Sequence, residues 1–224
     1  MTFRVAVLAS GRGSNLDSLL EKSRSGLMAA TVSLVLSDKQ DAPCLQKAKD
    51  AGVPAVLALP REKGESRAAY DGRLTDALQT EDPDLIVLAG FMRILTPAFC
   101  DAFAGRIINI HPALLPKHKG AHGIRDTLAA GDTVAGCTTH VVTAELDGGP
   151  ILLQASRPVL PGDDEETLAA RVLELEHRIL PRTVDLIARR HVLIALDGEV
   201  AIADSGSWAG RLPPIQDATF SPGY

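Results

Sequence analysis

The sequence predicts an α/β fold with a doubly wound, mostly parallel sheet, a Rossmann-like architecture that ends in an antiparallel extension. Short apolar runs recur through the first half of the chain, and stretches of helical character lie between them. After residue 137 this alternation gives way to strand-like runs placed around tight turns. Alternating strands and helices are typical of a parallel sheet covered on both faces. In such sheets ligands bind at the carboxyl ends of the strands, where the strand order reverses.

The apolar runs are expected to be buried strands, because strands covered on both faces read as continuous aliphatic segments. The first helical stretch carries leucines at positions 16, 19 and 20, which lie on one helix face. The expected strands are Val5–Ala9, Val32–Leu36, Ala55–Leu59, Leu85–Leu88 and Ile107–Ile110, and the expected helices are Asn15–Ser25, Ala42–Ala51 and Ser66–Thr80.

Two further strands and a long helix are expected after residue 137. The strands flank a turn around Asp147, because Asp and Gly favour turn geometry. The helix is expected to begin at Asp163 as its N-cap, with Glu166 three residues later completing a capping box. It should run to about Leu180, where Pro181 either kinks it or begins another helix. The two strands are Thr138–Val142 and Ile151–Val159.

The 224 residues are expected to form a single domain with a short extension, since the sequence contains no internal repeat, low-complexity segment or flexible linker. Residues 1–190 form the α/β domain in this interpretation. Residues 191–224 form a C-terminal hairpin and tail packed on the same domain. The hairpin strands are Val192–Leu196 and Glu199–Ala203, around Asp197-Gly198.

Composition excludes several classes of protein. The formal net charge is −5 and the sequence has no Lys- or Arg-rich run, which disfavours nucleic-acid binding. No apolar run approaches the roughly 18 residues of a membrane span, and the N-terminus is typical of a first strand, not of a signal peptide. Cys44, Cys100 and Cys137 are odd in number and far apart, so we expect buried free thiols in the cytoplasm.

The segment Ser10–Asn15, between the first strand and the first helix, is a candidate phosphate site. Its glycines allow a close backbone approach, and the helix behind it offers N–H groups and the positive end of its dipole. Ser14 and Asn15 can cap the helix or donate to phosphate oxygens. A dinucleotide fingerprint would need glycine where Leu16 stands, and no P-loop Lys follows. An ordinary strand–helix turn is the alternative.

Asn109 and His111 are candidate catalytic residues. They are two positions apart on an expected strand, so their side chains share a face, and Pro112 keeps His111 extended at the strand end. Acyl transfer needs a donor for the developing oxyanion and a group that handles the protons of the amine. The alternative is a strand-end pair bonded to backbone groups.

Asp147 has two possible roles. A turn aspartate is often only a turn former. Alternatively, its carboxylate faces the imidazole of His111, orients the ring and favours the protonated form.

Several motifs occur together in one order along almost the whole chain. They are the strand–GxGSN–helix opening, Ala89–Leu95 (AGFMRIL), Asn109-x-His111-Pro112 followed by LLP, Leu146–Pro150 (LDGGP) and Arg211–Pro214 (RLPP). In this combination the sequence resembles the folate-dependent formyltransferases that act on phosphoribosylglycinamide in purine synthesis. Asn-x-His-Pro with the later Asp marks the wider formyltransferase family, and the GxGSN loop narrows the resemblance to the ribonucleotide enzymes.

The resemblance implies transfer of a formyl group from 10-formyltetrahydrofolate, as co-substrate, to the amine of glycinamide ribonucleotide. It implies Asn109, His111 and Asp147 as the catalytic trio. No metal is expected, and the enzyme would be a monomer or homodimer. The implied substrate-binding residues are Gly13, Ser14 and Asn15 on the phosphate and Glu176 on the ribose; the implied folate-site residues are Arg67, Met92, Arg93, Ile94, Leu95, His140 and Ala144. Without the resemblance, composition alone would assign Met92–Leu95 to a loop or to the core. It would assign Glu176 to a solvated helix face.

Rival functions remain at this stage. A sister enzyme with the same trio would use methionyl-tRNA, an amino sugar or water as acceptor. The tRNA enzyme would be expected to carry a longer, basic C-terminal domain, and the hydrolase an extra domain before the first strand. A non-catalytic phosphosugar-binding module is the remaining alternative. His118-Lys119 and Ala113 depart from the commoner family pattern, and His118 and His122 are spaced like zinc ligands but lack the HExxH glutamate.

Overall fold

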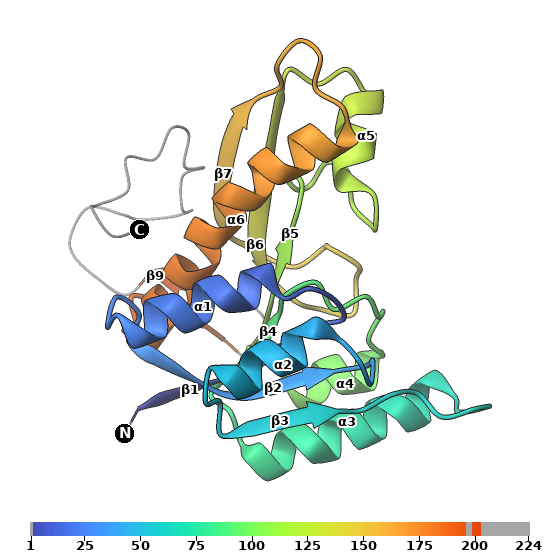
Figure 1. Ribbon diagram of the computed structural model, residues 1–224, viewed down its shortest axis with the longest axis vertical. Helices are drawn as coiled ribbons and strands as arrows, with labels where there is room; N and C mark the ends of the chain where they lie inside the picture. Colours follow the sequence, from blue (N-terminus) through green and yellow to red (C-terminus); the bar gives the residue numbers. More distant parts are fainter. Residues whose placement is uncertain (1, 196–198, 203–224) are drawn as a thin grey trace.

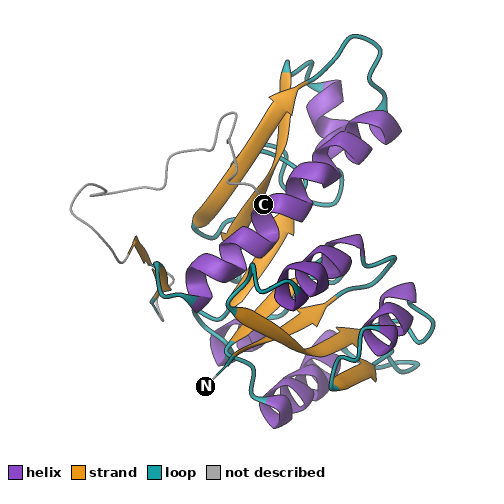
Figure 2. Cartoon of the chain, turned by 60° about the vertical axis from the view of Figure 1, so that its left-hand side comes forward, coloured by secondary structure: helices purple, strands orange, loops and turns teal. Residues whose placement is uncertain are grey.

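The computed structural model describes residues 2–195 and 199–202. Its main element is a seven-stranded sheet with helices on both faces (Figures 1 and 2). The strands of this sheet are β1 (Phe3–Leu8), β2 (Ala30–Ser37), β3 (Ala55–Ala58), β4 (Leu85–Leu88), β5 (Ile107–His111), β6 (Val134–Val141) and β7 (Ile151–Pro158). The helices are α1 (Ser14–Arg24), α2 (Pro43–Asp50), α3 (Arg67–Glu81), α4 (Pro97–Ala102), α5 (Gly123–Ala129) and α6 (Glu165–Ala188).

The strand order is β3-β2-β1-β4-β5-β6-β7. Strands β1 to β5 are parallel, and the β5–β6 and β6–β7 pairs are antiparallel. The chain moves outward from β1 to β3 and then returns to place β4 on the other side of β1. The order therefore reverses between β1 and β4, and this point is where doubly wound sheets bind ligands. The predicted fold class is confirmed.

Two apolar layers hold the helices to the sheet. One layer joins α1, α2, α5 and α6 to the sheet, and residues 5, 7, 16 and 19 in it are fully buried. The other joins α3 and α4 to the opposite face through Tyr70, Leu74 and Phe99. Alternate residues of β1 enter opposite layers, as the two-residue period of a strand requires. The continuous apolar runs of the sequence follow from this double coverage.

The start and course of the long helix differ from the expectation. Asp164, not Asp163, is the N-cap of α6, and it forms a capping box with Thr167 in place of Glu166. Asp163 instead accepts a hydrogen bond from Leu160 N at 2.7 Å. The helix also continues through Pro181 to Ala188. Apolar packing of α6 on β6, β7 and α1 outweighs the backbone hydrogen bond that the proline removes.

The remaining expectations are met in part. Strand boundaries agree within two residues, except that β6 begins at Val134, four positions before the expected start. The helices α4 and α5 were not expected. A small antiparallel hairpin of β8 (Val192–Ile194) and β9 (Val200–Ile202) is present. Its expected turn at Asp197-Gly198 and the Arg211–Pro214 motif lie outside the described residues. No helix in the described ranges combines the length and hydropathy of a bilayer span.

Candidate active site

The loop after β1 is tied to the loop after β4 by Ser10. Its N–H donates to the Gly90 carbonyl at 3.0 Å, and its hydroxyl accepts from Met92 N at 2.9 Å. Ser10 is buried, with 3% of its surface exposed. Two of the segments singled out from the sequence therefore meet at the point where the strand order reverses.

Gly13 gives the N-terminus of α1 an open shape. It is the N-cap residue, with φ 75°, and among the described residues no side chain caps this end of the helix. The first intrahelical hydrogen bond runs from Asp17 N to Gly13 O, so the N–H groups before it are left for another acceptor. An uncapped helix end beside a glycine loop is suited to an anion such as phosphate.

Substitution of Gly13 by alanine is expected to destabilise the protein by about 2–5 kcal/mol. The left-handed backbone costs a residue with a Cβ about 1–2 kcal/mol, and forced overpacking costs about 1–3 kcal/mol. An added Cβ would lie 2.7 Å from the Cβ of Cys44. Gly26→Ala is the matched control, because Gly26 has φ 74° but nothing within 4 Å of the added atom. Urea unfolding of both variants measures the difference, and equal losses would contradict the steric argument.

Asn15 and Glu176 lie far apart in the sequence and meet in the structure. Asn15 Nδ2 donates to Glu176 Oε2 at 2.7 Å, and each residue is 8% exposed. Burial raises the pKa of Glu176, and the hydrogen bond from Asn15 opposes that rise. Asn15 Oδ1 is buried and has no hydrogen-bond partner among the described residues. Glu176 is therefore not on a solvated helix face, and it links the middle of α6 to the start of α1.

The structure brings Asn109, His111 and Asp147 together, with His140 beside them. His111 Nδ1 lies 3.6 Å from Asp147 Oδ2, and His140 Nε2 lies 3.5 Å from Asp147 Oδ1. Asn109 Nδ2 is 3.1 Å from His140 Nε2. These contacts follow from strand pairing, because β5 and β6 place Asn109 directly opposite His140.

Hydrogen bonds to carbonyls fix the protons of both imidazoles. His111 Nε2 lies 2.8 Å from the His118 carbonyl, and His140 Nδ1 lies 3.0 Å from the Val141 carbonyl. A carbonyl only accepts, so each of these nitrogens carries a hydrogen. The amide nitrogen of Asn109 can only donate, so its 3.1 Å contact makes His140 Nε2 the acceptor. The Asn109 amide has two hydrogens, and the second is available to a ligand.

Burial decides the charge of His111. It lowers the pKa of this imidazole, and its effect exceeds the upward effects of the His118 carbonyl and the Asp147 carboxylate. Asp147 raises the pKa of the ring, in the direction expected, but the burial of an imidazole that is only 4% exposed lowers it further. When His111 takes up a proton, the Asp147 carboxylate stabilises the resulting imidazolium.

Asp147 is held as an anion. Burial opposes its ionisation, but its neighbours, above all His140 and the Gly120 N–H, lower the pKa of its carboxyl. Gly120 N donates to Asp147 Oδ2 at 2.8 Å. The backbone of Asp147 has φ 48°, a conformation that Asp tolerates better than most residues. The turn and the carboxylate contact therefore coexist in one residue.

The residues assigned to the folate are spread more widely. Met92 and Ile94 are 72% and 56% exposed, whereas Leu95 is buried. Arg67, at the start of α3, and Ala144 are exposed.

Arg93 turns away from solvent. Its guanidinium lies 3.8 Å from the centre of the Tyr70 ring and 3.9 Å from Asp38. Its side chain therefore supports the loop, whereas Met92 and Ile94 are exposed.

Sequence reasoning missed the backbone partners of the trio. The His118 carbonyl and Gly120 N–H hold His111 and Asp147, and a main-chain contact leaves no residue pattern to read. Of the two zinc-spaced histidines, His118 bonds Asp132 instead, at 2.8 Å. Among the described residues no group of three or more His, Cys, Asp or Glu is arranged for a metal. The three cysteines are buried and free, as expected.

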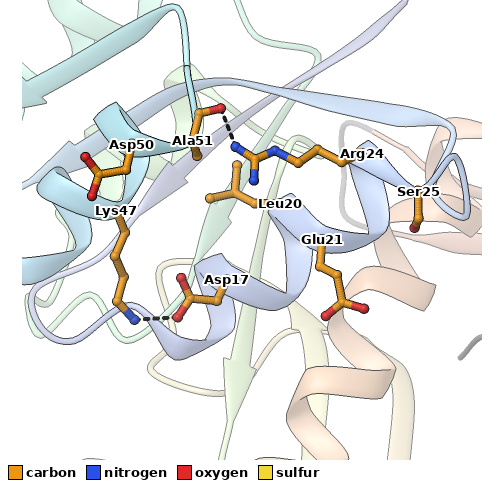
Figure 3. A pocket seen from close by; sticks show the side chains of 8 residues that line it. All are labelled: Asp17, Leu20, Glu21, Arg24, Ser25, Lys47, Asp50 and Ala51. Atoms are coloured by element: carbon orange, nitrogen blue, oxygen red, sulfur yellow. Dashed lines mark hydrogen bonds and ion pairs between the residues drawn. The ribbon is translucent and has the colours of Figure 1, made fainter.

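A surface hollow of about 590 Å³ between α1 and α2 is a poorer candidate (Figure 3). Lys47 pairs with Asp17 across it, and Arg24 donates to the Ala51 carbonyl at 2.6 Å. Both cations thus already have partners within the hollow, and no member of the trio lines it.

Comparison with known proteins agrees with this geometry. The formyl transferase family model matches residues 3–184. The phosphoribosylglycinamide formyltransferase of Escherichia coli (strain K12) is 43% identical over 212 residues, covering 94% of this chain and 96% of that protein. The protein of the same name from Mycobacterium tuberculosis is 44% identical over 191 residues, covering 85% and 87%.

Solved structures give the same result. The crystal structure of glycinamide ribonucleotide transformylase 1 from Symbiobacterium toebii superposes with a TM-score of 0.85. It is 43% identical and covers 91% of this chain and 95% of that one.

Proposed function

The chain belongs to the formyl transferase family, and from this premise we propose that it transfers a formyl group to the amine of phosphoribosylglycinamide in purine biosynthesis. The observation that carries the proposal is the position of the trio. Asn109, His111 and Asp147 lie at the same sheet edge as the uncapped N-terminus of α1. A phosphorylated amine therefore has an anion site and an acyl-transfer site at one edge of the sheet.

The ribonucleotide is held by the start of α1 and by α6. Backbone N–H groups around Gly13 and Ser14 receive the phosphate, since they precede the first intrahelical hydrogen bond. Glu176 accepts hydrogen bonds from the ribose hydroxyls. Its hydrogen bond with Asn15 fixes the ribose contact relative to the phosphate contact at the start of α1. This arrangement leaves the glycinamide amine free to reach the trio.

We propose 10-formyltetrahydrofolate as the formyl donor, bound along Met92–Leu95. The exposed Met92 and Ile94 offer apolar surface to a flat ring, and the Ser10 contact with Met92 N fixes this loop beside the ribonucleotide. Arg67 at the start of α3 is an accessible cation for the glutamate end of the donor. Ala144 and His140 complete this side of the site.

The trio handles both the charge and the proton of the reaction. When the amine nitrogen attacks the formyl carbon, the carbonyl oxygen becomes an oxyanion, and the free Asn109 N–H donates to it. His111 starts neutral and takes a proton from the attacking nitrogen at Nδ1, the ring nitrogen that faces Asp147. The resulting imidazolium stabilises the oxyanion, and Asp147 stabilises the imidazolium. The proton then passes to the departing folate nitrogen.

We further propose that the enzyme acts in the cytoplasm on small molecules alone, as a monomer or homodimer and without a metal. Support comes from the acidic net charge and the buried free thiols.

The proposal predicts release of tetrahydrofolate only when both substrates are present. The purified protein is incubated with 10-formyltetrahydrofolate, with and without glycinamide ribonucleotide, and tetrahydrofolate is followed by absorbance. Turnover that requires the ribonucleotide supports the transferase. Equal turnover without it would identify a hydrolase and would contradict the assigned acceptor.

A further inference from the structure

One loop provides backbone partners to two members of the trio. The segment of residues 117–120 gives the His118 carbonyl to His111 Nε2 at 2.8 Å and Gly120 N–H to Asp147 Oδ2 at 2.8 Å. The placement of this loop therefore decides which nitrogen of His111 carries the hydrogen. With Nε2–H held by the carbonyl, Nδ1 is the nitrogen left facing Asp147.

The backbone of His118 is in a conformation that needs support. Its φ is 54°, a left-handed value that side chains with a Cβ rarely adopt. A residue in this region persists when its surroundings hold it there. The carbonyl that meets His111 belongs to this residue, so whatever fixes the backbone of His118 also fixes that acceptor.

Asp132 is the group that holds His118. The imidazole Nε2 of His118 lies 2.8 Å from Asp132 Oδ2, and the side chains are 15% and 22% exposed. The hydrogen bond from His118, followed by that from Lys117, lowers the pKa of Asp132, so its carboxylate is an acceptor. Asp132 itself is fixed just after α5, where its N–H donates to the Thr127 carbonyl at 3.2 Å. Figure 1 shows α5 next to the start of α6, away from the loops after β1 and β4.

The other end of the loop is anchored separately. Gln154 Nε2 donates to the Leu115 carbonyl at 2.8 Å, and Leu115 N donates to Thr138 Oγ1 at 3.1 Å. These contacts fix the chain before residue 117 to β6 and β7. Lys119 and Gly120 hold the end of the loop through Glu145 and Asp147, and Asp132 is the side-chain partner of His118 itself.

We propose that Asp132 is a positioning residue for formyl transfer, acting through the side chain of His118 to place the carbonyl that holds His111 in its Nε2–H form. The inference rests on the proposed function, because it assumes that His111 handles the reacting proton. It adds a residue that belongs neither to the trio nor to the residues assigned to either substrate.

The test compares Asp132→Ala and Asp132→Asn with Lys117→Ala. Because a misplacement of about 1 Å in an active site costs about 10²-fold, Asp132→Ala is expected to lower kcat about tenfold or more, with both KM values nearly unchanged. Asp132→Asn keeps an acceptor oxygen and should retain more activity. Lys117 reaches the same carboxylate with a side chain that is 64% exposed. Its loss should change kcat less than about twofold, because exposed ion pairs contribute little.

Nitrogen-15 NMR of the imidazoles provides a readout that needs no turnover. We expect His111 as the Nε2–H tautomer in the wild type and as a mixture of tautomers in Asp132→Ala. Melting temperatures identify a general loss of structure. An unchanged tautomer in Asp132→Ala would overturn the inference, whether or not kcat falls. A lowered melting temperature with unchanged kcat would also overturn it. If instead His111→Ala stays active, the assignment of the trio fails and not the positioning by Asp132.

Discussion

Replacement of His111 or Asn109 by alanine is expected to lower kcat by at least about 10²-fold, because loss of one oxyanion donor typically costs about 10²–10³ in rate. Asn109 donates one amide hydrogen to His140 and keeps the second for the oxyanion. His111 keeps Nδ1 free of a hydrogen, so this nitrogen can take the proton of the amine. Both contributions arise in the transition state, so KM for either substrate should change little.

Steady-state kinetics with each substrate varied in turn provide the measurement. His122→Ala is the matched control, because His122 is an exposed imidazole at the start of α5. Its activity should equal that of the wild type. Circular dichroism and melting temperatures show whether the variants fold, since His111 is buried. More than a tenth of the wild-type kcat in both variants would refute the catalytic assignment.

Asn15→Ala is expected to raise KM for glycinamide ribonucleotide at least about tenfold and to leave kcat nearly unchanged. The Asn15 amide donates one hydrogen to Glu176, and we expect the second to bind the phosphate. A hydrogen bond to a charged group contributes about 1.5–3 kcal/mol, which corresponds to about 10- to 150-fold in affinity. The phosphate lies away from the reacting amine, so this contact is equal in the ground state and the transition state. KM for the folate should change little.

The alternative explanation for Asn15 is a purely structural role, and the structure shows what that role would be. The residue is not a helix cap, because Gly13 holds that position, and its amide donates to the buried Glu176. The alanine variant therefore also leaves a buried carboxyl without this donor, and stability should fall by about 1–3 kcal/mol. Thermal melts with and without ribonucleotide separate the two effects. A lowered melting temperature with an unchanged KM for the ribonucleotide would make the contact purely structural.

The strands were predictable from sequence because double coverage leaves a simple pattern. A continuous apolar run such as Leu85–Leu88 is buried along its whole length, and its bounds were predicted without error. The end of α6 was not predictable in this way. Local rules end a helix near Pro181, but the apolar face beyond it packs into the core. Tertiary packing decides such a case, and a sequence pattern does not show it.

Some missed elements did carry a signal. Thr96 followed by Pro97 is a typical helix start, and Thr96 caps α4 in the structure. By contrast, α5 begins at Gly123 with no side-chain cap among the described residues. Its start therefore has no capping residue that would predict a helix. Asp163 and Asp164 are adjacent, and either fits an N-cap. The choice depends on Thr167, whose side chain completes the capping box.

Some residues of the candidate site were predictable from the sequence pattern, and others were not. Asn109 and His111 were predictable because the two-residue period of a strand places them on one face at a sheet edge. Glu176 was predictable only from resemblance, since its partner Asn15 is 161 residues away. The His118 carbonyl and Gly120 N–H were out of reach, because any residue can supply a main-chain group. Such partners appear only when the chain is folded.

Transfer of a labelled formyl group tests the central claim most directly. The protein is given 10-formyltetrahydrofolate labelled with carbon-13 in the formyl group, together with glycinamide ribonucleotide, and the product is analysed by NMR. We expect the label as a formamide on the glycinamide nitrogen with wild-type protein, and at least about 10²-fold more slowly with His111→Ala. Label recovered as free formate, or transferred equally fast by the variant, would contradict the account.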